Sequence, residues 1–335
     1  MIRVLSRLLT FALLVIVLAV GAAAWWLHKP ISLNLPAGSQ VLDLEIEPGM
    51  RAAQVAEVVV ASGADVHVML LQGWFRVSGQ ARQIKAGSYE IVPGTTPRSL
   101  LSMVVRGDQT LKSITLVEGW NFSQVRAALQ KAELLTPDSM GLEPEMIMQK
   151  LGKPGIHPEG RFFPDTYSYA KGSSDLAVLK RAAKAMDKRL DAAWTLRSPD
   201  TPLKTRDEAL ILASIVEKET GKPTDRPQIG GVFTNRLRIN MRLQTDPTVI
   251  YGLGDAFDGN LRKRDLLADT PYNTYTRGGL PPTPIAMPGM AALLAAVQPA
   301  PTKALYFVAR GDGTSHFSAT LDEHNRAVNK YIRGQ

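Results

Sequence analysis

The sequence predicts an α+β protein with an N-terminal transmembrane helix, a small domain of strand–turn–helix units and a C-terminal mixed α/β domain. Three observations support this class. An uncharged run occupies positions 8–27. A strand–turn–helix pattern occurs three times between Leu42 and Leu129. The remaining chain combines amphipathic helical segments with a hairpin near the C-terminus. At 335 residues the chain is long enough for two or three domains.

The uncharged run at 8–27 indicates where the protein is located. Its twenty residues are enough to cross the hydrocarbon core of a bilayer as a helix. Arg3 and Arg7 precede it, and Trp25 and Trp26 lie near its other end. Basic residues stay on the cytoplasmic side and tryptophans favour the membrane interface, so we expect a single pass with the N-terminus inside.

Residues 1–7 are then cytoplasmic, and the chain after about Lys29 lies on the outer side of the membrane. A cleaved signal peptide is the alternative, because Ala22–Ala24 resembles a small-residue cleavage site. We favour an uncleaved anchor, because the apolar run is longer than the core of a usual signal peptide.

Composition excludes several functions. The absence of cysteine rules out disulfides, thiolate metal sites and a cysteine nucleophile. The five histidines show no spacing typical of metal ligands, so we expect no metal and no cofactor. The net charge of +8 is spread along the chain without a basic run interleaved with aromatics, so we expect no nucleic-acid partner. An anionic membrane surface, an acidic polymer or no specific partner all suit this charge.

The repeat lies within residues 36–132. Ile46–Gly49, Ile91–Gly94 and Leu116–Gly119 each end an apolar strand at a glycine, and apolar residues follow that glycine at +6, +9 and +10. This spacing predicts a strand, a tight turn and an amphipathic helix, with the glycine adopting positive φ. Such units resemble LysM-type glycan-binding modules. A compact spacer domain is the alternative.

The other elements follow from periodicity and capping residues. The segment 160–169 is aromatic around a Pro–Asp turn and predicts an exposed loop or a strand edge. We expect helices at 66–79 and 175–197, the second capped by Ser174, and a short helix with turns at 134–152. We also expect a hairpin of 305–309 with 316–318 and a final helix from a capping box at 320–323 to about Tyr331.

The segment Leu210–Gly221 predicts an apolar helix that carries Glu217 near its C-terminal end. Apolar surroundings and the negative end of the helix dipole both raise a carboxyl pKa. A carboxyl that stays protonated near neutral pH can act as a general acid. Glu217 is therefore the candidate for chemistry, and a surface position is its alternative. Glu219 points about 200° away and is interpreted as solvated or as a partner of Lys222.

Polar and aromatic residues follow this helix. Residues 241–252 predict an exposed polar loop beside a core strand, and a second turn-rich stretch occupies 271–282. Aromatic rings stack on sugars, and amides hydrogen-bond sugar hydroxyls. A turn-rich loop without a ligand is the alternative for the second stretch. The candidate substrate-binding residues are Gln244, Asp246, Asn273 and Tyr275.

Several long motifs occur in a fixed order. They are EGRFFPDTYSY at 159–169, IVEKET at 215–220, NRL at 235–237, MRLQTDPTVIYG at 241–252, YNTY at 272–275, GLPPTPI at 279–285 and LYFVARGDGTSHF at 305–317. Together these motifs resemble those of the endolytic murein transglycosylase family, also called YceG-like. The resemblance extends from the membrane anchor nearly to the C-terminus.

The resemblance assigns roles to parts of the chain. It places the family's catalytic glutamate on Glu217. It implies a LysM-like subdomain in the repeat region and a YceG-like catalytic domain over residues 155–335. From residue type and motif position, we expect the four candidate substrate-binding residues to line the cleft.

The implied activity is that of a lytic transglycosylase, a carbon–oxygen lyase that acts on peptidoglycan. It implies cleavage between N-acetylmuramic acid (MurNAc) and N-acetylglucosamine (GlcNAc) in nascent strands without water, which leaves 1,6-anhydroMurNAc ends and terminates elongation. It also implies peptidoglycan synthases as partners. The expected location is the bacterial inner membrane, with the catalytic domain in the periplasm.

Two alternatives remain open from the residues. A glycoside hydrolase would use Glu217 with Asp246 as the second carboxylate, and a separation of about 5–10 Å would suit that chemistry. A non-catalytic cell-wall scaffold would bind glycan through the repeats and use Glu217 structurally.

Overall fold

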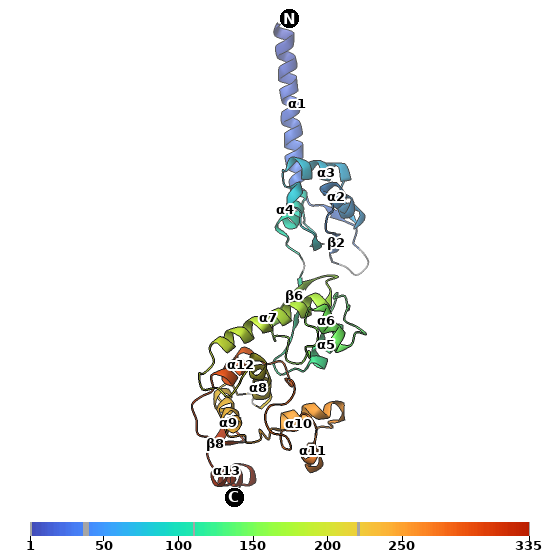
Figure 1. Cartoon of the computed structure of the whole chain (residues 1–335). Coiled ribbons are helices and arrows are strands. Elements are labelled where there is room, and N and C mark those ends of the chain that lie inside the picture. The colour runs from blue at the N-terminus through green and yellow to red at the C-terminus, as the bar shows by residue number, and fades with distance from the viewer. Residues whose placement is uncertain (1, 36–39, 110, 220–221, 335) are drawn as a thin grey trace. The chain divides into compact units, whose positions relative to one another are not determined.

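The computed structural model describes residues 2–35, 40–109, 111–219 and 222–334, and the chain divides into two compact units (Figure 1). Unit 1 comprises Met1–Lys112 and unit 2 comprises Ser113–Gln335. Strand β5 (Leu111–Thr115) crosses the boundary. Unit 1 contains α1 (Ile2–His28), β1 (Ser32–Leu33), β2 (Leu42–Ile46), α2 (Ala52–Ala61), β3 (Ala64–Asp65), α3 (Val68–Val77), a 3₁₀ turn (Ala81–Gln83), β4 (Gly87–Ile91) and α4 (Pro97–Arg106).

Unit 2 is mostly helical, with two small sheets. Its elements are α5 (Phe122–Lys131), α6 (Pro144–Lys150), β6 (Thr166–Ala170), α7 (Asp175–Thr195), α8 (Arg206–Glu219), α9 (Arg226–Arg238), α10 (Asp246–Leu253), a 3₁₀ turn (Gly254–Ala256), α11 (Lys263–Leu267), α12 (Met290–Val297), β7 (Tyr306–Ala309), β8 (Ser315–Ser318), α13 (Leu321–Val328) and a π-helical turn (Asn329–Arg333). The predicted mixed class, the hairpin β7–β8 and the final helix are confirmed.

Helix α1 contains a segment long and apolar enough to cross a membrane. Its residues Thr10–His28 have a mean hydropathy of 2.3, and the protein buries none of this stretch. A helix of this composition meets the length requirement of a bilayer core, and an N-terminal signal sequence meets it as well. The structure therefore agrees with the expected apolar helix.

Unit 1 is built on a two-stranded sheet covered by helices. Strands β2 and β4 pair antiparallel with Leu42 opposite Ile91 and Ile46 opposite Gly87. Alternate residues of β2 face inward and are buried against α2, α3 and α4. The expected turns are present, because Gly49 and Gly94 adopt φ of 89° and 94°, a region that favours glycine.

The third strand–turn–helix copy, β5–α5, belongs mainly to unit 2. Its glycine, Gly119, also adopts positive φ. At the start of α5, Phe122 stacks on Phe162 with ring centroids 5.4 Å apart. The first part of segment 160–169 is thus not an exposed loop, because Phe162 and Phe163 are buried and their apolar area drives it inward. The strand alternative holds for the second part, where Thr166–Ala170 form β6 and pair with β5.

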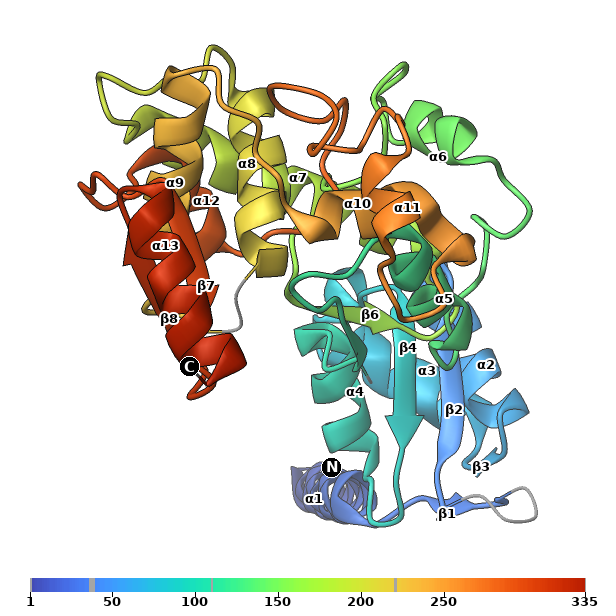
Figure 2. The same ribbon diagram turned by 90° about the horizontal axis from the view of Figure 1, so that it is seen from below.

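A layer of four helices, α7, α8, α9 and α12, forms the core of the last part of unit 2. Figure 2 shows α8 with α9 and α12 on one side and α10 on the other. Helix α8 has almost no polar residue between Ala209 and Val216, and that stretch is buried on nearly every side. The predicted helix end at Gly221 lies outside the described residues.

The segment 241–252 differs from its expected form of a polar loop. Residues Asp246–Leu253 form helix α10, with Pro247 in its first turn. Proline fits the first turn because its fixed φ is helical and its missing N–H would have had no partner there. Asp246 also suits the positive end of the helix dipole. A Thr–Asp–Pro sequence thus starts a helix here.

Close packing of α9 on α12 depends on a glycine. A Cβ on Gly230 would lie 2.2 Å from the carbonyl oxygen of Ala295, a backbone atom that cannot move without shifting α12. We expect Gly230→Ala to lower the free energy of unfolding by about 2–3 kcal/mol through overpacking. Chemical denaturation of the full-length wild type and variant measures this change in the free energy of unfolding. Gly278→Ala, where a Cβ meets open space, is the control, and equal stability of the two variants would contradict this packing.

Candidate functional site

Glu217 lies in a buried junction. Its side chain is 3% exposed, and one carboxylate oxygen pairs with Arg226 at 2.7 Å while the other accepts the Gly289 N–H at 2.9 Å. Burial raises its pKa, while the Gly289 hydrogen bond and Arg226 oppose the rise and the charge of Glu118 adds to it. Both oxygens therefore have protein partners, and α8, α9 and the segment before α12 are held together.

Glu219 points into a different environment. Its carboxylate hydrogen-bonds the Thr245 hydroxyl just before α10. Burial raises its pKa, the Thr245 hydrogen bond lowers it, Asp246 raises it and Arg236 lowers it. Glu219 is thus not fully solvated, the first of the two interpretations that the sequence suggested, because it has the Thr245 hydroxyl as a partner. It is partly exposed, and it lines a cavity.

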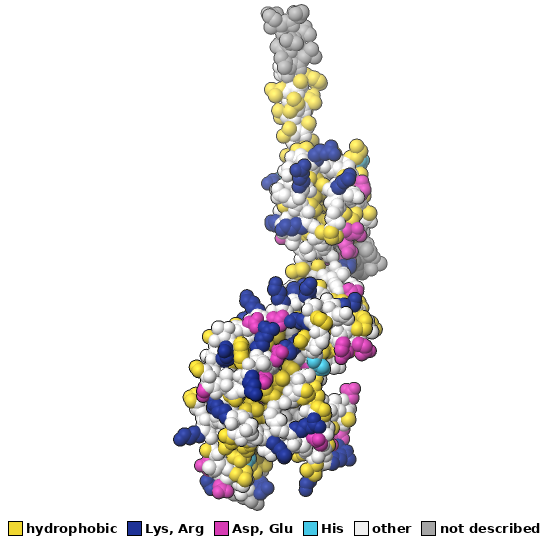
Figure 3. Space-filling model, viewed as in Figure 1, with side chains coloured by type: hydrophobic (Ala, Val, Ile, Leu, Met, Phe, Trp, Pro, Cys, Tyr) yellow, Lys and Arg dark blue, Asp and Glu magenta, His cyan; other side chains and the backbone are white. Residues whose placement is uncertain are grey.

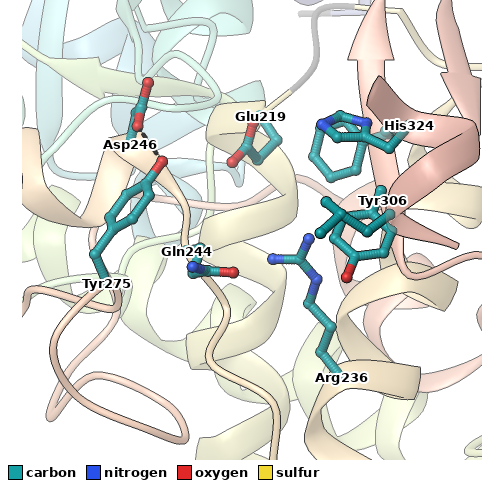
Figure 4. Close-up of a pocket in the computed structure, with 9 residues that line it drawn as sticks. Glu219, Arg236, Gln244, Asp246, Tyr275, Tyr306 and His324 are labelled. Carbon is teal, nitrogen blue, oxygen red and sulfur yellow. Dashed lines mark hydrogen bonds between the residues drawn. The ribbon is translucent and has the colours of Figure 1, made fainter. Parts of the chain in front are cut away.

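The cavity has a volume of about 430 Å³ (Figure 4). Three predicted substrate-binding residues, Gln244, Asp246 and Tyr275, line it together with Glu219. In Figure 4 they surround the glutamate on one side, and Arg236, Tyr306 and His324 lie on the other. The remaining lining residues are Phe307 and Leu321.

Asp246 and Tyr275 form one wall of the cavity. The Tyr275 hydroxyl donates to a carboxylate oxygen of Asp246 at 2.5 Å. Asp246 is exposed at the start of α10, where the helix dipole stabilises its charge. The negative charge of Asp246 in turn favours a protonated Glu219. Two carboxyls with different surroundings therefore share one cavity.

Gln244 is held in a strained backbone conformation. Its φ is 51°, in the left-handed region that non-glycine residues rarely adopt, and its N–H donates to the Thr274 carbonyl at 3.2 Å. Such strain persists only where neighbouring structure enforces it, and it concentrates at functional sites. The conformation places the Gln244 side chain at the cavity (Figure 4).

Arg236 lies on the side of the cavity opposite Asp246 and Tyr275, next to Tyr306. Its guanidinium donates to the carbonyls of Leu305 at 2.7 Å and Leu243 at 2.5 Å. It also lies 5.3 Å from the ring centroid of Tyr306, which stacks on His324 at 5.2 Å. Arg236 thus links Leu305, the residue just before β7, with Leu243, the residue just before Gln244.

Asn273 does not line the cavity. It is fully buried, and its amide donates to the carbonyls of Asp265, Leu266 and Ala268 while its oxygen accepts the Tyr275 N–H at 2.9 Å. Every polar atom of this amide is used within the loop. Its position makes it an organiser of the loop that presents Tyr275.

Glu159 is a second buried carboxyl near α10. It accepts the Phe122 N–H at 3.1 Å and the Tyr251 hydroxyl at 3.0 Å, so it connects the start of α5 with α10. Burial raises its pKa from 4.5 to about 7, although the hydrogen bonds from Phe122, Tyr251 and Gly160 oppose the rise. This carboxyl remains protonated in the folded protein at pH values where it ionises in the unfolded chain.

No three His, Asp or Glu side chains come together in the described part of the chain in a way that could hold a metal ion. The groups that line the cavity are carboxyls, an amide, a guanidinium and aromatic rings.

The fold is a mixed α/β domain in which a carboxyl at the C-terminal end of a buried helix lines a cavity. The YceG-like family model matches residues 44–330, and the chain belongs to this family. It is 32% identical to the endolytic murein transglycosylase of Bacillus subtilis, over 90% of this chain and 85% of that protein. It is 25% identical to the endolytic murein transglycosylase of Streptococcus pneumoniae, over 92% of this chain and 59% of that protein.

A solved structure shares the fold. The crystal structure of a putative YceG-like protein from Listeria monocytogenes superposes with a TM-score of 0.54 at 27% identity, covering 86% of this chain and 98% of that one. The family resemblance expected from the motifs is confirmed.

Sequence reasoning missed Glu219, Arg236, Tyr306 and His324 as lining residues. The signal for Glu219 was its two-residue offset from Glu217, since a helix that buries one of these side chains turns the other outward. Arg236 carried a weaker signal, because it lies within the NRL motif. Tyr306 and His324 come from the hairpin and the last helix, and no local pattern connects them with α8.

We expect Glu159 to make stability depend on pH. Between pH 4.5 and about 7 the unfolded chain releases this proton and the folded chain keeps it, so stability falls as pH rises through that window. The full effect is on the order of 3 kcal/mol. Glu159→Gln cannot ionise, so the free energy of unfolding of wild type should fall relative to that of this variant as pH rises from 5 to 8, measured by chemical denaturation.

Glu145→Gln, at an exposed position, controls for the loss of one negative charge. A difference in free energy of unfolding between wild type and Glu159→Gln that stays constant from pH 5 to 8 would show that Glu159 titrates outside this range.

Proposed function

We propose that this protein is a lytic transglycosylase that cleaves peptidoglycan glycan strands, with Glu219 as its acid and base. The observation that carries the proposal is the placement of Glu219 in the cavity formed with Gln244, Asp246 and Tyr275. The family and the names of the relatives support the reaction class. The sequence prediction of Glu217 as the acid competes with this assignment.

The chemistry requires a carboxyl that starts protonated. Glu219 donates its proton to the oxygen between MurNAc and GlcNAc, the C–O bond breaks, and an oxocarbenium-like centre forms at the MurNAc anomeric carbon. The ionised Glu219 then removes the proton of the MurNAc 6-hydroxyl, whose oxygen bonds to that carbon. The product is a 1,6-anhydro end, no water is added, and Glu219 is protonated again.

One carboxyl suffices because the nucleophile belongs to the substrate. A hydroxyl held beside its target has a large effective concentration, so no second carboxylate is needed to activate water. Burial and the neighbouring charge of Asp246 raise the pKa of Glu219 and favour the proton-donating form. The Thr245 hydroxyl fixes the direction of the carboxyl.

The walls of the cavity suit a sugar chain. Tyr275, Tyr306 and Phe307 give the cavity aromatic surface for the apolar sides of sugar rings, and Gln244 offers an amide for hydroxyls and N-acetyl groups. Asp246 accepts a hydrogen bond from Tyr275 and keeps its second oxygen available for a sugar hydroxyl.

Glu217 has a supporting role in this proposal. A carboxyl with a 3% exposed side chain and two protein partners offers little surface to a glycosidic oxygen. Its ion pair with Arg226 and its bond to Gly289 fix the C-terminal end of α8, and that end carries Glu219. Glu217 is thus a positioning residue.

Helix α1 and the strand–turn–helix repeats hold the catalytic site close to its substrate. Helix α1 anchors the protein in the bacterial inner membrane with residues 1–7 in the cytoplasm, and the catalytic domain lies in the periplasm. The strand–turn–helix repeats form a LysM-like module that binds glycan. Cleavage close to the membrane terminates nascent strands, and peptidoglycan synthases are partners. The apolar length of α1 and the repeated turns support these assignments.

The two glutamates are separated by paired variants of the full chain in detergent. Glu219→Gln keeps the shape and removes the proton, so we expect a loss of anhydro-ended product by about 10²–10⁴-fold. Glu217→Gln is the matched control two residues away. It leaves Arg226 without its full partner and loosens the end of α8 that carries Glu219, so we expect lower stability and a loss of activity per folded molecule far smaller than that of Glu219→Gln. Products from uncrosslinked glycan strands are read by mass spectrometry.

Each other outcome has a definite meaning. Loss of activity with Glu217→Gln and retention with Glu219→Gln would establish Glu217 as the acid. Reducing-end products, one water heavier than anhydro products, would indicate a hydrolase using Asp246 as second carboxylate. No cleavage by wild type would favour a glycan-binding scaffold.

A further inference from the structure

An apolar groove lies at the junction of α1 and α3 in unit 1. It has a volume of about 560 Å³. One side is formed by the last residues of the apolar segment of α1, and the other by one face of α3. The lining residues are Ala22, Ala23, Trp25, Trp26 and Leu27 from α1, and Met69, Leu70, Gly73, Trp74 and Val77 from α3.

Helix α3 has two apolar faces. Leu71 and Phe75 are buried in the core of unit 1. On the other face, Met69 is 70% exposed and Val77 is 83% exposed. A helix on a soluble protein normally presents polar residues to water, and a contiguous exposed apolar face indicates a binding surface.

The length of the apolar segment of α1 determines how deep α3 lies in a bilayer that α1 crosses. The apolar segment Thr10–His28 is about 28 Å long as a helix, which matches the thickness of the hydrocarbon core. From α1 the groove is lined by five residues between Ala22 and Leu27, near the end of this segment, and they span about 9 Å. When α1 crosses the membrane, α3 therefore lies at the boundary between acyl chains and headgroups, where interfacial helices insert by about 5–10 Å.

The composition around the groove suits this boundary. Trp25, Trp26 and Trp74 all line the groove, and tryptophan rings favour the membrane–water interface. Lys29 lies 5.2 Å from the ring of Trp25, and Arg98 lies 3.4 Å from His28. Cationic side chains at the end of a span face the headgroups.

Figures 1 and 3 show the same arrangement within unit 1. Helix α3 lies at the end of the unit from which α1 emerges, and β2 lies toward the other end. Hydrophobic side chains continue from α1 onto that end of the unit, with basic side chains beside them.

We propose that α3 is a second membrane contact, an interfacial helix whose Met69–Val77 face inserts into the outer leaflet beside the transmembrane anchor. The lipid occupies the groove, because the groove is continuous with the surface of α1 that the bilayer covers. Unit 1 thereby contacts the membrane through two helices, α1 and α3. This inference rests on the anchoring of α1 in the proposed function.

The test uses the absence of natural cysteine in the chain. Val77→Cys and Met69→Cys, at the two ends of the exposed face, are each labelled with an environment-sensitive fluorophore in the full chain. The proteins are reconstituted into phospholipid vesicles with or without lipids carrying a doxyl quencher. We expect both labels to emit at shorter wavelength than in water and to lose most of their intensity with shallow quenchers. Glu45→Cys, on the exposed face of β2, is the control and should be unaffected.

Flotation of the vesicles separates the possible failures. Protein that does not float with the vesicles would refute the anchor and this inference with it. Protein that floats, with labels at positions 69 and 77 still water-like, would refute the interfacial helix and leave the anchor standing. A blue-shifted label that the doxyl lipids do not quench would show that a protein surface covers α3, and would overturn the lipid assignment.

Discussion

The ion pair between Glu217 and Arg226 joins the helices on which the candidate site depends. A buried glutamate is costly unless it is paired and hydrogen-bonded, and here the Gly289 N–H supplies the second bond. Helix α8, helix α9 and the segment leading into α12 therefore meet at one carboxyl. The turn of the third repeat joins them, because Gly119 donates to the Met287 carbonyl at 2.9 Å.

Helical geometry then determines where Glu219 points. Two residues further along α8, its side chain turns about 200° away from Glu217 and leaves the core. It meets Thr245 at the start of α10, and that short helix also carries Asp246. The buried junction thus fixes the helix, and the helix fixes the carboxyl in the cavity. Burial of Glu217 therefore fixes the orientation of α8, and the hydrogen bond to Thr245 fixes the carboxyl of Glu219.

The sequence was most informative where local chemistry decides structure. Glycines at 49, 94 and 119 marked turns that require positive φ, and all three adopt it. Ser174 was expected to cap a helix, and its side chain accepts the Leu176 N–H. Sequence reasoning failed where long-range packing decides. Phe162 is buried by its stack on Phe122, about forty residues away in the chain, and no local pattern shows this.

The site was predicted in part for the same reason. The motifs identified Gln244, Asp246 and Tyr275, which the structure places together, because these residues lie in continuous segments on either side of the cavity. Asn273 belongs to the same motif but is turned inward by its three amide hydrogen bonds to loop carbonyls. The choice between Glu217 and Glu219 depends on which face of α8 is packed, and α9 and α12 determine that face.

The most direct test of the central claim is a structure of the Glu219→Gln protein with a glycan fragment bound. The account predicts the scissile glycosidic oxygen within hydrogen-bond distance, about 3 Å, of the side-chain amide at position 219. Sugar rings should then rest against Tyr306. A glycosidic oxygen beside Glu217, or a glycan that leaves the cavity empty, would contradict it.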